Sequence, residues 1–195
     1  MQSPPSLVEV QVNLIGAWRL FRRDPSGINL FGQDEAAFWK SFWCAVIIAP
    51  AYIALLVLIP DQLRTQVSLV RVVPVEIISY AIGWVAWPLI AYTLLGVMGV
   101  RDRYIPYIVA YNWSSGPQVL MLLGIALVSA AFNLPMDAFL MMNLFAMIWL
   151  LAYHGYIIRV ATGLDIGVVF LMVLGEAVLS YMVNFARDVV TLGLF

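Results

Sequence analysis

One acidic residue stands in the middle of an uncharged stretch near the end of the chain. Glu176 is the only formal charge between Ile166 and Ala186. In a helix rising about 1.5 Å per residue, its carboxyl group lies about 16 Å beyond the nearest flanking charge. An unpaired carboxylate at that depth in a bilayer is expensive, so an acid inside a membrane is a functional candidate. Glu176 is therefore the first candidate for chemistry.

Three roles are open for Glu176. It is a protonated acid that fixes helix packing, a partner for a charged residue of another subunit, or a carrier of protons or ions. We expect the protonated form, because no cation lies at the same depth to hold the carboxylate ionised. Ser180 and Asn184 follow at steps of four residues. All three share one helix face, which should point into the bundle because lipid offers no hydrogen-bond partners.

Uncharged polar side chains fall in the same layer as Glu176 when depth is counted at about 1.5 Å per residue from the nearest charge on the expected cytoplasmic side. Asn112 and Tyr92 lie about 13 Å deep, and Ser115 lies about 16 to 18 Å deep. We expect a hydrogen bond from Asn112, Tyr92 or a serine to Glu176. The candidate intramembrane site is Glu176, Asn112, Ser115, Tyr92 and Ser180.

The chain has one histidine, His154, and one cysteine, Cys44. His154 lies about 7 Å from the expected cytoplasmic end of its span, one helical turn before Arg159. We therefore expect it well above Glu176 in depth, bonded to a backbone carbonyl or a neighbouring tyrosine. Cys44 is expected to be a small buried apolar residue, since it cannot form an internal disulfide. One histidine, one distant carboxylate and no reactive thiol make neither a metal site nor a catalytic triad.

Sequence motifs for catalysis and nucleic-acid binding are missing from the chain. It has no Walker loop, Gly-x-Ser-x-Gly elbow, His-Glu-x-x-His or haem-attachment motif. The net charge of −1 comes with no basic cluster that resembles a nucleic-acid patch. We expect no enzyme, no cofactor, no metal and no nucleic-acid partner.

The segment Tyr111–Pro117 reads Tyr-Asn-Trp-Ser-Ser-Gly-Pro. Pro117 cannot donate to the carbonyl four residues back, and Gly116 weakens the helix just before it. The segment predicts a kink or a break near mid-membrane. Transporters bind substrates and ions at broken helices, but proline kinks also occur in membrane helices without a transport role.

Long apolar stretches must position these groups. Hydrophobic residues make up 64% of the 195-residue chain, charged residues make up 11%, and the mean hydropathy is +0.95. A helix of about 20 apolar residues crosses a bilayer. The sequence predicts an all-α polytopic membrane protein with one bundle of five transmembrane helices at 36–195. The predicted spans are 37–59, 76–99, 105–132, 137–159 and 166–187.

Residues 1–35 form a separate amphipathic segment. A helix is expected from about Ser6 to Arg23. Its apolar residues recur at steps of three and four, at Leu7, Val10, Leu14, Trp18 and Phe21. Its basic residues are Arg19, Arg22 and Arg23. Tryptophan on the apolar stripe and arginines near the end suit a helix in the headgroup layer of the lipid bilayer, and packing on the protein's own cytoplasmic face is a compatible alternative.

Basic residues divide unevenly between the two ends of the predicted spans. Seven fall on the side of the N-terminus: Arg19, Arg22, Arg23, Lys40, Arg101, Arg103 and Arg159. Three fall on the other side: Arg64, Arg71 and Arg187. This predicts a cytoplasmic N-terminus and a C-terminus on the opposite side. Nine arginines against one lysine often accompany GC-rich bacterial genomes, so a bacterial inner membrane is the expected location.

The second and third predicted spans are joined by the tight turn Gly99-Val100-Arg101-Asp102-Arg103, and a tyrosine-rich helix with a proline follows. Together with the N-terminal region and the five closely spaced spans, the pattern from about Gln33 to Asn184 resembles the bacterial relatives of the Yip family of Ypt/Rab-interacting membrane proteins. The acidic Asp-Leu-Tyr-Gly-Pro motif of the eukaryotic members is absent, so GTPase binding is not carried over. The resemblance implies a non-catalytic protein concerned with organisation, trafficking or complex assembly.

Two classes of function remain open. The first is a non-enzymatic scaffold, assembly factor or accessory subunit that meets a membrane-protein partner, or a second copy of itself, through helix–helix contacts. The second is a small proton- or ion-coupled transporter that uses Glu176 and a broken third helix at Tyr111–Pro117. A scaffold should tolerate Glu176→Gln, because an amide keeps much of the hydrogen bonding of a protonated acid, whereas a proton carrier should lose coupling with its fold intact.

Overall fold

The computed structural model describes residues 3–59 and 67–193. Within these residues the chain is all-α, with seven α-helices and two short 3-10 helices. The elements in order are α1 Leu7–Phe21, η1 Pro25–Leu30, α2 Glu35–Ser41, α3 Trp43–Leu58, α4 Leu69–Val97, η3 Arg101–Arg103, α5 Tyr104–Ala131, α6 Met136–Thr162 and α7 Ile166–Leu192.

Five helical stretches are long and apolar enough to cross a membrane, as the sequence predicted. They are Glu35–Leu58, Leu69–Val97, Arg101–Ala131, Met136–Thr162 and Ile166–Leu192. The first combines α2 and α3, which join at Phe42. The chain therefore has the composition and helix lengths of a polytopic membrane protein.

The second span begins earlier than the sequence indicated. α4 starts at Leu69, whereas the predicted start was residue 76. The additional turns contain Arg71 and reach Glu76. Arg71 fits in this helix because its Nη2 donates a hydrogen bond to the backbone oxygen of Val190, 2.8 Å away near the end of α7. Part of the predicted loop, with Arg64, lies outside the described residues.

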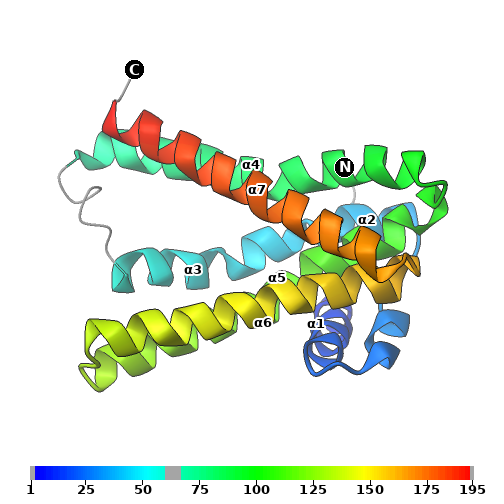
Figure 1. Cartoon of the computed structure of the whole chain (residues 1–195), viewed down its shortest axis with the longest axis horizontal. Helices are drawn as coiled ribbons and strands as arrows, with labels where there is room; N and C mark the ends of the chain where they lie inside the picture. The colour runs from blue at the N-terminus through cyan, green and yellow to red at the C-terminus, as the bar shows by residue number, and fades with distance from the viewer. Residues whose placement is uncertain (1–2, 60–66, 194–195) are drawn as a thin grey trace.

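The long helices form two layers that meet at one end and separate toward the other (Figure 1). α3 packs on α5 and α5 packs on α6 in one layer, while α4 pairs with α7 in the other. The end where the layers meet carries the α4–α5 and α6–α7 connections, and with them Arg101, Arg103 and Arg159. We call it the basic end. The described C-terminal end of α7 lies at the opposite end.

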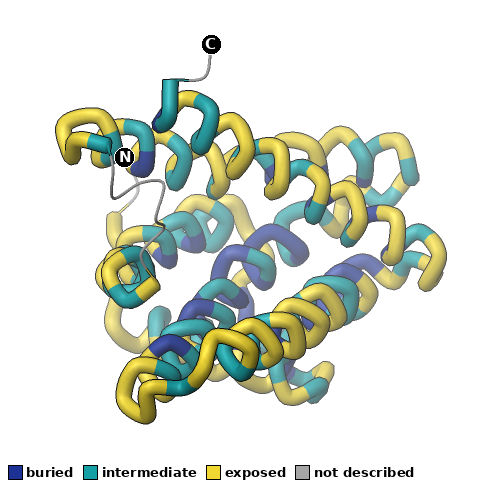
Figure 2. Tube along the Cα trace, turned by 60° about the vertical axis from the view of Figure 1, so that its left-hand side comes forward, coloured by how far each residue is buried: buried dark blue, intermediate teal, exposed yellow. Residues whose placement is uncertain are grey.

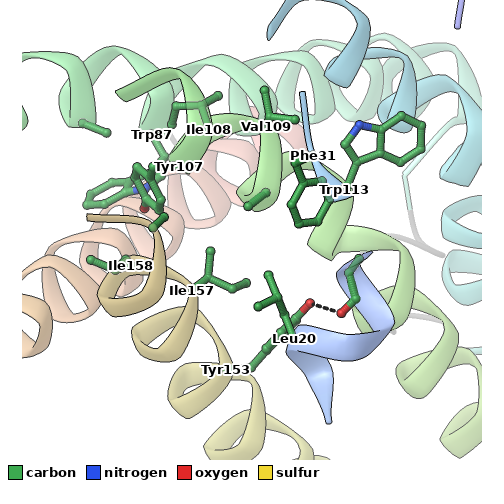
Figure 3. Packing of buried hydrophobic residues seen from close by; sticks show 14 of the residues in the cluster. Leu20, Phe31, Trp87, Tyr107, Ile108, Val109, Trp113, Tyr153, Ile157 and Ile158 are labelled. Atoms are coloured by element: carbon green, nitrogen blue, oxygen red, sulfur yellow. Dashed lines mark hydrogen bonds between the residues drawn. The ribbon is translucent and has the colours of Figure 1, made fainter. Parts of the chain in front are cut away.

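α5 is the central helix of the bundle. It contacts α1, α2, α3, α4 and α6, and buried positions gather where it passes between the other helices (Figure 2). Tyr107 of α5 is fully buried, and its hydroxyl accepts a hydrogen bond of 2.6 Å from the Trp87 indole of α4. The Tyr107 ring lies against Trp87 in the core (Figure 3). Hydrogen bonding of both polar tips allows these large rings to be buried without an unpaired group.

Helix α1 is present and lies across the bundle near the basic end (Figure 1). It begins with a capping box, in which Ser6 Oγ accepts from the Glu9 amide and the Glu9 carboxylate accepts from the Ser6 amide. Its buried residues are Gly16, Ala17 and Leu20. Tyr153 of α6 donates a hydrogen bond of 2.8 Å to the backbone oxygen of Ala17 (Figure 3). α1 is therefore docked on the protein.

Only part of the apolar stripe expected on α1 lies on the face of the helix that packs on the protein. Val10, Leu14 and Phe21 pack against the core. Leu7 and Trp18 do not, with 82% and 51% of their surface exposed. The small residues Gly16 and Ala17 are buried instead. A Cβ on Gly16 would come within 3.0 Å of the Gly27 backbone oxygen in η1, and the Ala17 backbone oxygen accepts the hydrogen bond from Tyr153. α1 thus carries apolar side chains on its outer face as well.

Lys40 of α2 fixes the beginning of α1. Its Nζ lies 2.6 Å from the Glu9 carboxylate. The hydrogen bond from Lys40, with those from Ser6, lowers the pKa of Glu9 from 4.5 to about 2. After α1, hydrogen bonds from Ser26 lower the pKa of Asp24, which caps η1. These half-buried charges hold the N-terminal segment in place outside the long helices.

Candidate functional site

Glu176 of α7 and His154 of α6 face each other at the interface between their helices. The Nδ1 atom of His154 lies 2.9 Å from the Oε1 atom of Glu176. The side chains are 16% and 6% exposed, respectively. A histidine and a carboxylate this close and this buried form a strong, charge-assisted pair.

The prediction that His154 lies well above Glu176 is wrong. The depth of His154 was counted from Arg159, but α6 continues to Thr162 before its glycine cap at Gly163. The three additional residues place His154 about 4.5 Å deeper. Nδ1 of His154 consequently contacts Glu176 and not the expected backbone carbonyl.

Tyr111 of α5 supplies the second hydrogen bond to the acid. Its hydroxyl donates to Glu176 Oε1 over 2.8 Å. The expected donors were Asn112, Tyr92 or a serine. Tyr111 was missed because the sequence argument compared depths and could not see which face of α5 turns toward α7.

Gln118 extends the chain of hydrogen bonds on the other side of His154. Its Nε2 lies 2.7 Å from His154 Nε2 and donates to Ser114 Oγ over 3.0 Å. When the Gln118 amide donates to Nε2, that nitrogen carries a lone pair, so the proton of the neutral ring is on Nδ1 and points at Glu176. The carboxyl atom Oε2 of Glu176 is buried with no hydrogen-bond partner among the described residues. Oε2 is therefore the oxygen that can carry a proton.

The other members of the predicted site lie elsewhere. Asn112 is fully buried and donates from Nδ2 to Ser41 Oγ over 2.8 Å, so it ties α5 to α2. Tyr92 is 47% exposed and packs on the Tyr104 ring at the basic end. Neither residue touches Glu176. Both were placed by depth alone, which fixes a layer of the membrane but not a side of the bundle.

Ser180 and Ser115 line two adjoining cavities between the helix layers. The first, of about 190 Å³, has a polar part formed by Tyr52, Tyr80, Tyr111, Ser180, Asn184 and Arg187. The second, of about 230 Å³, includes Tyr111, Ser115 and Gln118 in its wall. Cavities of this size and polarity accommodate several water molecules. Tyr111 belongs to both walls, and Gln118 belongs to the second, so the two ends of the Glu176 network reach the cavities.

A second buried charge pair lies at the other end of the first cavity. Arg187 Nε approaches Glu76 Oε1 to 3.8 Å, and Tyr52 donates to Glu76 Oε2 over 3.3 Å. Arg187 also binds its neighbour Asp188 at 3.0 Å. Along α7, Glu176 and Arg187 are separated by about 16 Å. The polar face of this helix therefore connects the two charged sites. This pair was missed because Glu76 was placed at the very start of the second span, and its partner Arg187 at the far end of the last one.

The third span is not broken. α5 is one continuous helix from Tyr104 to Ala131 and contains Pro117. Gly116 lies where α1 crosses, because a Cβ there would come within 2.9 Å of the Leu14 side chain. The Ser-Gly-Pro sequence thus allows the close approach of α1. The expectation of a break is corrected on this point.

The N-terminal residues proposed for a membrane or partner interface have two different environments. Trp18, Arg19 and Arg22 are exposed on α1. Phe21 packs against Trp149 and Tyr153 of α6. Arg23 donates to the backbone oxygen of Ala152 over 2.8 Å. Phe21 and Arg23 are therefore docking residues of this chain itself.

The arrangement offers proton chemistry rather than metal chemistry. Among the described residues, no group of three histidine, cysteine or acidic side chains is placed to hold a metal ion. The network instead contains an acid, an imidazole, a phenol and an amide in hydrogen-bond contact. Each of the first three can accept or donate a proton. Comparisons of the chain with family models, curated proteins and solved structures gave no match.

Proposed function

We propose that this protein is a small proton-coupled membrane transporter, in which Glu176 carries the proton and the polar cavities hold the transported solute. The observation that supports the proposal best is the contact between Glu176 and His154, joined through Tyr111 and Gln118 to the cavity walls. Intramembrane acids in contact with histidine are the usual components of proton relays. No catalytic role is proposed.

The network has two protonation states that its own side chains can stabilise. In one, Glu176 holds a proton on Oε2 and the His154 ring is neutral. In the other, Oε2 has released its proton, Nε2 of His154 has taken one up, and the carboxylate lies 2.9 Å from the charged ring. A half-turn of the Gln118 amide brings its oxygen to Nε2, which then donates. The same side chains thus hydrogen-bond in both states, as a proton carrier requires.

The cavities favour a small polar solute or a cation. Their polar walls consist of hydroxyl and amide groups, and the one arginine, Arg187, is already near Glu76 and Asp188. An anionic solute would need a free cation at this depth. Neutralisation of Glu176 by a proton, followed by exchange of that proton for the solute, would couple proton movement to solute movement.

The proposal is tested by proton movement in proteoliposomes with a trapped pH-sensitive dye. Sodium, potassium, ammonium and a mixture of neutral amino acids serve as trial solutes. We expect at least one solute gradient to drive proton movement by the wild type, and the Glu176→Gln protein to move none. Glu35→Gln, an exposed acid exchanged in the same way, should behave as the wild type. A wild type that moves no protons with any of these solutes, or a Glu176→Gln protein that moves as many, contradicts the proposal.

A scaffold or accessory subunit is the second candidate, favoured by the outer face of α1. Val8, Ile15 and Trp18 are each at least half exposed there, although the opposite face of the helix is docked. The face suits either the headgroup layer of the bilayer or a membrane-protein partner or second copy. This role also agrees with the resemblance to the Yip family. Purification from native membranes in mild detergent tests it, since a stoichiometric partner is expected for a subunit and none for a transporter acting alone.

We further propose that the membrane is a bacterial inner membrane and that the basic end faces the cytoplasm. The arginines at the α4–α5 and α6–α7 connections and the docked N-terminal segment support this orientation. Labelling of single cysteines placed at Asp102 and at Ser68 tests it, after replacement of Cys44 by serine. Only the Ser68 position should react with a membrane-impermeant reagent in intact cells.

A further inference from the structure

We propose that the groove between α6 and α7 at the basic end binds an anionic phospholipid, with its phosphate between Arg23 and Arg159 and an acyl chain on the apolar wall. The groove lies apart from the polar cavities, which open between α3, α4, α5 and α7. This inference is independent of the proposed transport function.

The groove has the shape and lining of an acyl-chain site. It encloses about 510 Å³ where α7 diverges from α6 (Figure 1). Its apolar wall consists of Leu151, Ala152, Ile166, Val169, Phe170, Val173, Leu174 and Ala177. Phe170 and Leu174 are 65% and 50% exposed, so this wall faces outward. In a membrane-spanning helix pair an outward apolar groove is in contact with lipid.

Two guanidinium groups lie on the same groove without an acidic partner. Arg23 and Arg159 are both part of its lining. Their hydrogen bonds go to backbone oxygens, those of Ala152 and Leu164. The ion pairs among the described residues involve neither arginine. Each guanidinium has five N–H donors, so most remain available to phosphate oxygens.

Aromatic side chains hold Arg23 at the groove. Its guanidinium lies 5.0 Å from the Trp149 ring centre and 5.2 Å from that of Tyr156. The Tyr156 hydroxyl donates to the Arg23 backbone oxygen over 2.8 Å. These contacts fix the Arg23 guanidinium beside α6, in the lining of the same groove as Arg159.

An anionic phospholipid matches both parts of this surface. Its phosphate complements two positive charges, and its acyl chain covers Val173, Leu174 and Ala177 deeper in the groove. An apolar helix from a partner or from a second copy would cover the wall but leave both guanidinium groups without an anion. A zwitterionic lipid would gain less, because its headgroup brings a positive charge to the arginines.

The test is native mass spectrometry of the full chain released from micelles that contain equal amounts of phosphatidylglycerol and phosphatidylcholine. We expect the wild type to retain phosphatidylglycerol preferentially. Arg159→Gln should weaken that preference about fivefold, and Arg23→Gln with Arg159→Gln about thirtyfold, since each basic residue near an anionic headgroup contributes about a factor of five. Ala177→Phe, which fills the apolar wall, should lower retention of both lipids.

The control is the pair Arg101→Gln with Arg103→Gln, which removes the same charge at the same end of the bundle. It should retain phosphatidylglycerol as the wild type does. Equal loss in this control, an unchanged preference in Arg159→Gln, or equal retention of both lipids by the wild type would overturn the proposal. So would an Ala177→Phe protein that loses a dimer while its lipid retention is unchanged, because the occupant would then be a second copy. Arg159 is exposed on α6, so its variant tests the site without disturbing the docking of α1.

Discussion

Glu176 Oε1 and His154 Nδ1 lie 2.9 Å apart where α7 packs on α6, and the hydroxyl of Tyr111 approaches the same oxygen. The acid therefore has two donors on one oxygen and, within residues 3–59 and 67–193, none on the other. Within this network the carboxyl and the imidazole groups can each take up or release a proton without any movement of the helices.

Replacement of the imidazole should separate proton transfer from folding. In His154→Gln the amide can still donate to Glu176, so we expect the unfolding temperature to change little. The variant lacks the one imidazole of the chain, the side chain that changes charge near neutral pH. The pH profile of proton movement in proteoliposomes should lose its histidine-dependent limb. An unchanged profile would show that His154 only positions the acid.

Loss of the Tyr111 hydroxyl should slow proton exchange between Glu176 and the cavity. Tyr111→Phe removes one of two routes, so we expect a fall of about tenfold, less than the ~10²–10⁴-fold that a sole acid–base group supplies. Tyr92→Phe is the matched control, because Tyr92 does not contact the network. Proton movement in proteoliposomes measures both. Equal effects of the two substitutions would exclude a specific route through Tyr111.

The Glu76–Arg187 pair should show strong coupling in a double-mutant cycle. Arg187→Met leaves the Glu76 carboxylate largely buried, and we expect a loss of about 2 kcal/mol in the free energy of unfolding. This is below the ~3–5 kcal/mol of a fully buried pair, because the 3.8 Å separation is long for an ion pair. Adding Glu76→Leu should restore most of the stability, as measured by denaturant unfolding in detergent. Additive losses would contradict a direct interaction.

The lengths of the helices could be predicted from sequence because hydropathy reports them directly. All five spans appear, although α4 begins before residue 76 and α7 continues past residue 187. The beginning of α4 could not be predicted, since Arg71 read as a loop charge and Glu76 as the boundary of the span. Their partners, the Val190 carbonyl and Arg187, are more than a hundred residues away in sequence. Charge positions alone therefore underestimate the length of a helix whose charged side chains bind to another helix that is distant in sequence.

The membership of the site could be predicted only in part. Glu176 stood out because a charge in an apolar stretch is rare. Tyr111, which binds Glu176, and Gln118, which binds His154, carry no such signal, because uncharged polar residues are common in membrane helices. His154 was visible but was placed one turn too shallow. Depth counting needs the end of each helix, and the end of α6 is set by the glycine cap at Gly163 rather than by Arg159.

The Glu9–Lys40 pair gives the N-terminal segment a dependence on acidic pH. The pKa of Glu9 is lowered from 4.5 to about 2, so its contribution to folding is complete above pH 4.5 and is lost as the pH falls toward 2. Lys40→Met should return this pKa toward its ordinary value. A carboxyl-carbon NMR titration of Glu9 measures the change, with Glu35 as an internal reference. A Glu9 pKa that is unaffected by Lys40→Met would show that the two groups do not interact in solution.

The central claim is that Glu176 takes up and releases a proton within the membrane. Infrared difference spectroscopy between acidic and alkaline pH measures this most directly, because a protonated carboxylic acid has a carbonyl band that the carboxylate lacks. We predict a band that changes with pH in the wild type and in Glu35→Gln and is missing in Glu176→Gln. A difference spectrum that is the same in the wild type and in Glu176→Gln would contradict the claim and leave Glu176 a fixed element of helix packing.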